Sequence, residues 1–140
     1  AGLRFGYGIA HPSIIDQMTK VKDSYNCDAI AIAAASAALD DQDYAKACWA
    51  RVREQRQRLT GELTARAFSV LPSQGNFVLA TVPNAGDAGA WYRSLKSQGV
   101  LVRFFDKPGL RDKLRITVGT PEENDALLAA LDAARSTLLA

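Results

Sequence analysis

Three arginines lie inside short apolar stretches of the sequence, where a permanent positive charge is unusual. They are Arg4 in GLRFGY, Arg103 in VLVRFF and Arg115 in KLRITV. An arginine between apolar neighbours on a strand points to one face of the sheet while those neighbours point to the other. Its planar guanidinium matches the geometry of a carboxylate or a phosphate. Each arginine alone could simply face water, but the three together favour a site for an anionic small molecule.

Two further residues are weaker candidates for ligand contacts. Asn76, in SQGNF, stands where a strand begins, and its side chain could bind a ligand or satisfy the preceding turn. Tyr25, in DSYN, places a hydroxyl on a loop and could equally be a packing residue. His11 is the single histidine of the sequence, which disfavours both a zinc site and a Ser-His-Asp triad.

The elements that must position these residues follow from the apolar pattern. We expect a strand over residues 3–10, because large apolar side chains alternate there with glycines and Arg4. A short helix is expected from Pro12, and a helix capped by Asp28 should run to about Leu39. A long helix from about Gln42 to Arg66 follows, with apolar residues at four- and seven-residue steps.

The second half of the sequence alternates between strand and helix patterns. Strands are expected in SVLPS, NFVLATV, VLVRFF and KLRITVG. A helix that begins after Asp87 should end at a glycine cap, Gly99, and TPEE predicts a capping box at Thr120. Residues 41–140 therefore predict helix–strand–strand–helix–strand–strand–helix, an α+β arrangement of helices on a small antiparallel sheet.

The composition excludes several classes of protein. The 140 residues carry a formal net charge of +2 with both signs interspersed, which argues against a nucleic-acid partner bound through bulk charge. The alanine-rich stretch from Asp28 to Leu39 is too short to span a membrane. We expect no secretory signal and no metal site. Cys27 and Cys48 are expected to be reduced thiols in a cytoplasmic protein.

Several motifs together carry a family resemblance. AGLRFGYGIAHPSII, KVKDSYNCDAIAIAAA, LPSQGNFVL, GVLVRFFDKPGL and LRITVGTPEENDALLAAL occur in this order along the chain. They resemble the C-terminal part of the histidinol-phosphate aminotransferases, which are pyridoxal-phosphate enzymes of the aspartate-aminotransferase fold. The resemblance implies an α/β fold, with residues 1–40 as the last elements of the large cofactor domain and the crossing segment. Residues 41–140 would form the α+β C-terminal small domain.

The resemblance also implies roles for single residues. Arg4 would bind the phosphate of pyridoxal 5'-phosphate. Arg115 would bind the substrate α-carboxylate or its phosphate end, and Arg103 would help to hold the substrate phosphate. Asn76 and Tyr25 would lie near the substrate, on weaker support. No lysine of this sequence matches the family's Schiff-base motif, so we expect no catalytic residue in the chain and no activity from the chain alone.

Three functions remain open at this point. The first is a histidinol-phosphate aminotransferase of histidine biosynthesis, a cytoplasmic homodimer acting on a small-molecule substrate. The second is a related enzyme, an aromatic-amino-acid aminotransferase or a threonine-phosphate decarboxylase. The third is a stand-alone α+β module that binds an anion. Without the rest of the large domain, we expect residues 1–40 to be poorly packed, or to pair with a second copy of the chain.

Overall fold

The computed structural model describes residues 2–139, apart from the side chain of residue 85. The chain separates into two compact units, residues 1–47 and 48–140. This boundary lies within one long helix, α3, and the division of the family fold between residues 40 and 41 stays a prediction. The helices and strands in chain order are α1 (Pro12–Val21), α2 (Ala29–Asp40), α3 (Gln42–Ala65), β1 (Ser69–Val70), β2 (Phe77–Thr81), η1 (Pro83–Ala85), α4 (Ala88–Ser97), β3 (Arg103–Phe104), β4 (Lys113–Thr117) and α5 (Pro121–Leu138).

The unit of residues 1–47 holds α1 and α2, and both begin where the sequence predicts. Pro12 occupies the first turn of α1, and the Nδ1 atom of His11 accepts a hydrogen bond from the Ser13 amide at 3.3 Å. His11 is therefore the N-cap of this helix. Asp28 caps α2, because its Oδ1 atom accepts from the Ala31 amide at 2.8 Å.

The strand predicted over residues 3–10 is wrong. The segment has no regular structure in the described chain, and Arg4 has a φ of 55°, which lies in the left-handed region. A strand needs a hydrogen-bonded neighbour, and every strand pair among residues 2–139 lies beyond residue 68. Apolar side chains alternate in residues 3–10, but no strand among the described residues pairs with this segment.

The same unit buries almost nothing. Ala31 is its one buried apolar side chain among the described residues, while Ile9, Val21 and Tyr25 are 90%, 86% and 94% exposed. This observation agrees with the expectation that residues 1–40 are poorly packed.

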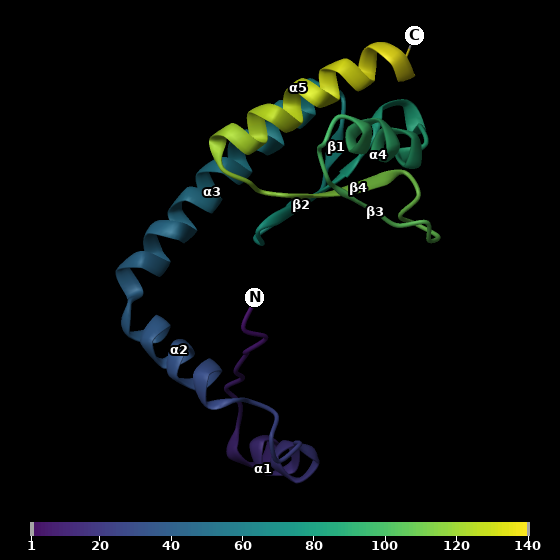
Figure 1. Cartoon of the computed structure of the whole chain (residues 1–140). Helices are drawn as coiled ribbons and strands as arrows, with labels where there is room; N and C mark the ends of the chain where they lie inside the picture. Colours follow the sequence, from purple (N-terminus) through teal and green to yellow (C-terminus); the bar gives the residue numbers. More distant parts are fainter. Residues whose placement is uncertain (1, 140) are drawn as a thin grey trace. The chain divides into compact units, whose positions relative to one another are not determined.

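The unit of residues 48–140 contains a four-stranded antiparallel sheet in the order β1-β2-β4-β3. Its elements follow the predicted order of helices and strands, with η1 as an added turn. Residues 48–65 of α3 lie with α4 and α5 on one face of this sheet (Figure 1), and apolar side chains of all three helices join its core. The core between them joins Leu59 and Leu63 of α3, Trp91 and Leu95 of α4, Leu127 and Leu131 of α5, and Val78, Ala80, Leu114 and Ile116 of the sheet.

Both predicted helix caps in this unit are confirmed. Gly99 has a φ of 80°, and the amides of Gly99 and Val100 donate to the carbonyls of Lys96 and Leu95 at 3.1 and 3.0 Å. These two hydrogen bonds form a Schellman motif. At α5, Thr120 and Glu123 form the reciprocal capping box.

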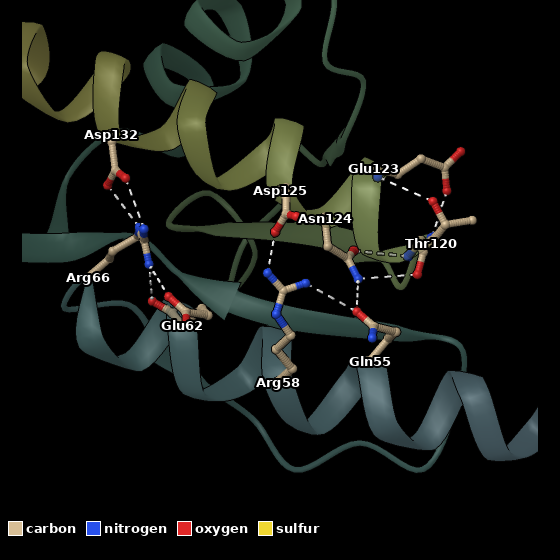
Figure 2. A network of polar contacts seen from close by, with 10 residues as sticks. Gln55, Arg58, Glu62, Arg66, Thr120, Glu123, Asn124, Asp125 and Asp132 are labelled. Atoms are coloured by element: carbon tan, nitrogen blue, oxygen red, sulfur yellow. Dashed lines mark hydrogen bonds and ion pairs between the residues drawn. The ribbon is translucent and has the colours of Figure 1, made fainter.

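A row of ion pairs ties α3 to α5 (Figure 2). Arg66 makes a two-pronged contact with Asp132, with distances of 2.8 and 2.9 Å, and it also contacts Glu62 at 2.6 Å. Arg58 pairs with Asp125 further along the two helices. The hydrogen bond from Arg66 lowers the pKa of Asp132, and the same contacts raise the pKa of Arg66.

Asn124 is the buried polar residue of this unit and ends the same row (Figure 2). Its Nδ2 atom donates to Gln55 Oε1 at 3.1 Å and to the Gly119 carbonyl at 3.2 Å. Its Oδ1 atom accepts from the Gly119 amide at 3.1 Å. Asn124 thus fixes the turn between β4 and α5 against α3, directly after the strand that carries Arg115.

Candidate anion-binding site

Arg115 lies in the middle of β4, on the face of the sheet that the helices leave uncovered. Its neighbours Leu114 and Ile116 are buried in the core, and Arg115 itself is exposed. This arrangement follows from the two-residue period of a strand. The predicted opposition between the arginine and its apolar neighbours is therefore present.

Arg103 lies beside Arg115 on the neighbouring strand. The two residues are Cα partners in the register of β3 and β4, and Arg103 is also exposed. Side chains directly opposite each other on antiparallel strands lie on the same face of the sheet. The structure therefore brings together two of the arginines that the sequence singles out.

Within the described residues 2–139, the two guanidinium groups have no acidic partner. Each ion pair found among residues 2–139 uses other side chains; Asp106, three residues after Arg103, pairs with Arg111 at 2.7 Å. Like charges directly opposite on paired strands cost stability. A pair of uncompensated cations on one exposed face is a suitable site for an anion, which would remove this repulsion.

Aromatic rings are the neighbours of these cations. The Cζ atom of Arg115 lies 5.4 Å from the centroid of the Phe77 ring and 5.7 Å from that of Phe105. The Cζ atom of Arg103 lies 5.5 Å from the Phe105 centroid. These distances are within the range of cation–π contacts. Neither ring is among the residues predicted from the sequence, although Phe105 follows Arg103 at the two-residue spacing that shares a strand face.

Asn76 lies immediately before β2. Its carbonyl accepts from the Val118 amide at 2.9 Å, so it extends the pairing of β2 with β4. Its side chain borders a hollow of about 330 Å³ that is also lined by Trp49, Arg53 and Arg56. Arg56 donates to the Gly75 carbonyl at 2.8 Å and holds this turn. Both the turn and the ligand interpretations of Asn76 remain compatible with this position.

Arg4 and Tyr25 belong to the other unit, residues 1–47. Both are exposed, and Tyr25 is 94% exposed. Among the residues that the structure describes, the Arg4 guanidinium has no ion-pair partner, so its donors are free for an anion. Their expected contacts with cofactor and substrate stay predictions.

Other kinds of site find no support in the described part of the chain. No group of three or more His, Cys, Asp or Glu residues within it is placed to bind a metal ion. None of its helices combines the length and the hydropathy needed to cross a membrane.

Comparison with known proteins identifies the family of this chain. The family model of the class I and II aminotransferases matches residues 1–131. The chain belongs to this family, and the resemblance noted in the sequence is confirmed. The α/β fold expected from that resemblance is confirmed as well, because pyridoxal-phosphate-dependent aminotransferases are its structural neighbours.

Within this family, the chain is similar in sequence to histidinol-phosphate aminotransferases. The chain is 50% identical over 131 residues to histidinol-phosphate aminotransferase 1 of Trichormus variabilis, a match that covers 94% of this chain and 37% of the relative. It is 43% identical over 134 residues to the histidinol-phosphate aminotransferase of Pseudomonas putida, covering 94% of this chain and 38% of that protein. The chain therefore spans little more than a third of the length of these relatives.

Solved structures give the same grouping. The histidinol-phosphate aminotransferase of Sinorhizobium meliloti, in complex with pyridoxal-5'-phosphate, matches with a TM-score of 0.86 and 32% identity, over 98% of this chain and 38% of that one. The L-threonine-O-3-phosphate decarboxylase of Porphyromonas gingivalis matches with a TM-score of 0.72 and 25% identity, over 94% of this chain and 42% of that one.

Proposed function

We propose that this chain is the substrate-anion-binding part of a pyridoxal-phosphate-dependent aminotransferase that acts on histidinol phosphate. The observation that carries the proposal is the Arg103–Arg115 pair, two register-matched cations on one exposed sheet face with no acidic partner among residues 2–139. A phosphate offers several acceptor oxygens to such a pair. The names of the most similar relatives support the same substrate.

In this proposal the arginines position the substrate. Arg103 and Arg115 donate hydrogen bonds to the phosphate of histidinol phosphate, and to a carboxylate of the second substrate, glutamate, in the other half-reaction. Holding the anionic end fixes where the amine lies, which converts an encounter between free molecules into a reaction within one complex. The strands β3 and β4 supply the rigid frame for both guanidinium groups.

The residues of this chain fit pyridoxal phosphate at its phosphate group. The Arg4 guanidinium has no ion-pair partner in the described part of the chain, and its N–H groups are the donors that a cofactor phosphate requires. The cofactor, when bound, supplies an electron sink for the substrate α-carbon. The proposal requires a lysine outside this sequence, because none of the lysines present matches the family motif.

The decisive experiment is steady-state kinetics of the full-length protein that contains this chain. We expect amino transfer with histidinol phosphate and much weaker activity with phenylalanine. The Arg115→Gln variant should raise KM for histidinol phosphate by about 100-fold, because a charged hydrogen-bond donor is lost. Arg111→Gln is the matched control, since Arg111 pairs with Asp106 at the surface. An unchanged KM in Arg115→Gln would refute the assignment.

A second candidate is a threonine-phosphate decarboxylase, favoured by the similarity to the Porphyromonas gingivalis structure. Both substrates carry a phosphate, so the arginine pair would serve either one. Release of CO₂ from threonine phosphate, without amino transfer to a keto acid, would select this candidate. The match over residues 1–131 favours an enzyme of this family over a stand-alone anion-binding module.

The homodimeric state, the cytoplasmic location and the role in histidine biosynthesis are parts of the same proposal. The biosynthetic role is supported by the names of the relatives. Sedimentation equilibrium of the full-length protein tests the dimer, and a monomer at micromolar concentration would contradict it.

A further inference from the structure

We propose that Phe105 is a positioning residue whose ring holds the guanidinium groups of Arg103 and Arg115 together so that both reach one anion. The proposal rests on the proposed function, in which these arginines bind the substrate phosphate. It adds a residue that touches the arginines and not the substrate.

The geometry places the ring against both cations. The Arg103 and Arg115 Cζ atoms lie 5.5 and 5.7 Å from the centroid of the Phe105 ring. A positive charge over an aromatic face is attracted by the ring quadrupole at such distances. One ring therefore gives both guanidinium groups a favourable contact, although their charges repel each other.

The chemistry of the partner explains why a ring serves here better than an acid. A carboxylate would hold the arginines through their N–H groups and would compete with the anionic substrate for the same donors. A ring contacts the guanidinium through its electron-rich face and uses none of those hydrogen-bond donors in the plane. The arginines are thus held in place while their N–H groups stay free for the phosphate.

The next residue provides an internal contrast. Phe104 points to the opposite side, where its ring stacks on Tyr92 with centroids 6.2 Å apart, and it packs against the core. Phe77 contacts Arg115 at 5.4 Å and no other arginine among residues 2–139. Phe105 alone among these three rings joins Arg103 to Arg115.

The test uses the full-length protein and its kinetics with histidinol phosphate. Phe105→Leu removes the ring and keeps an apolar side chain of similar size. We expect KM to rise about fivefold to tenfold, with kcat within about twofold of the wild type, because two cation–π contacts are lost. Phe105→Tyr, which retains the ring, should restore KM. Phe104→Leu is the matched control and should leave KM unchanged.

The two proposals fail in different ways. If Arg115→Gln raises KM and Phe105→Leu does not, the role of Phe105 is refuted and the proposed function stands. If neither variant changes KM, the proposed function is refuted, and the role of Phe105, which rests on it, is refuted with it.

A second measurement covers the case in which Phe105→Leu does not fold, as judged by circular dichroism. In the wild-type protein, ring currents should shift the side-chain proton resonances of Arg103 and Arg115 upfield. Resonances of both arginines at the positions found for exposed arginines would overturn the proposal.

Discussion

The two units of this chain differ in how much of their stability they supply themselves. Residues 48–140 enclose a core with fully buried side chains from three helices and two strands, and they cap their helices internally. Residues 1–47 form two capped helices but bury Ala31 alone among the described residues. Helices with side-chain caps are present in both units, so caps alone form helices without making a core.

The difference also separates the candidate site residues. Arg103 and Arg115 stand on a sheet whose position is fixed by the core beneath it. Arg4 and Tyr25 lie in a unit that buries Ala31 alone among its described residues. No core of that unit therefore fixes the positions of these two side chains. The arginine pair is therefore the part of the candidate site that the core of this chain holds in position.

The largest contrast is expected in hydrogen exchange of the 140-residue chain. Amides of β2 and β4 should exchange only through global unfolding, slowed by at least about 1,000-fold. Amides of residues 2–47 should be slowed by less than about tenfold, because fraying helices open locally at little cost. Similar protection in both units would contradict the comparison.

Core truncation should give the next largest effect. Trp91 is 2% exposed and packs edge-on against Phe68 at 5.1 Å. Trp91→Ala should lower the free energy of unfolding by about 3–5 kcal/mol. Ile9→Ala, at a side chain that is 90% exposed, should change it by less than about 0.5 kcal/mol. Urea denaturation measures both, and an equal loss from the two variants would count against two distinct units.

Asn124 should have an intermediate effect. Asn124→Ala removes the side chain that pairs with the amide and carbonyl of Gly119, while Gln55 keeps its hydrogen bond from Arg58. Half-buried polar groups left unpaired should reduce the free energy of unfolding by about 1–3 kcal/mol. Thermal unfolding followed by circular dichroism measures the loss. A variant as stable as the wild type would show that the turn before α5 does not need this side chain.

The smallest effect concerns the pairing of Arg66 with Asp132. The pKa of Asp132 is lowered in the folded state, so its contribution is present above the unfolded value of about 4 and is lost as pH falls through the folded value. Asp132→Asn should cost less than about 1 kcal/mol at pH 7, because the carboxylate is half exposed. The difference between variant and wild type should shrink as the pH falls through the lowered pKa of Asp132 in the folded state. A difference that does not change with pH would argue against this ion pair.

The sequence predicts most of the fold of residues 48–140 because its signals there are local. The Thr120 capping box, the Gly99 cap and the alternation around Arg115 each involve a few neighbouring residues. The strand predicted at residues 3–10 fails for the opposite reason, since a strand depends on a partner that alternation does not reveal.

The candidate site was predictable in its charges but not in its aromatic contacts. Apolar neighbours of Arg103 and Arg115 indicate strands, and the antiparallel sheet then brings the two arginines together. The two-residue spacing from Arg103 places Phe105 near that arginine, but the contact of its ring with Arg115 depends on how the chain just beyond β3 lies against β4. The distance between residues 105 and 115 along the chain hides this contact further.

The central claim is that Arg103 and Arg115 bind one anion together, and a double-mutant cycle tests it most directly. The affinity of the full-length protein for histidinol phosphate is measured by calorimetry for the wild type, Arg103→Gln, Arg115→Gln and the double variant. We predict that each single variant weakens binding by at least about tenfold, and that the double variant loses at least about tenfold less than the product of the two single losses. Losses that multiply independently, or no loss in either single variant, would contradict the claim.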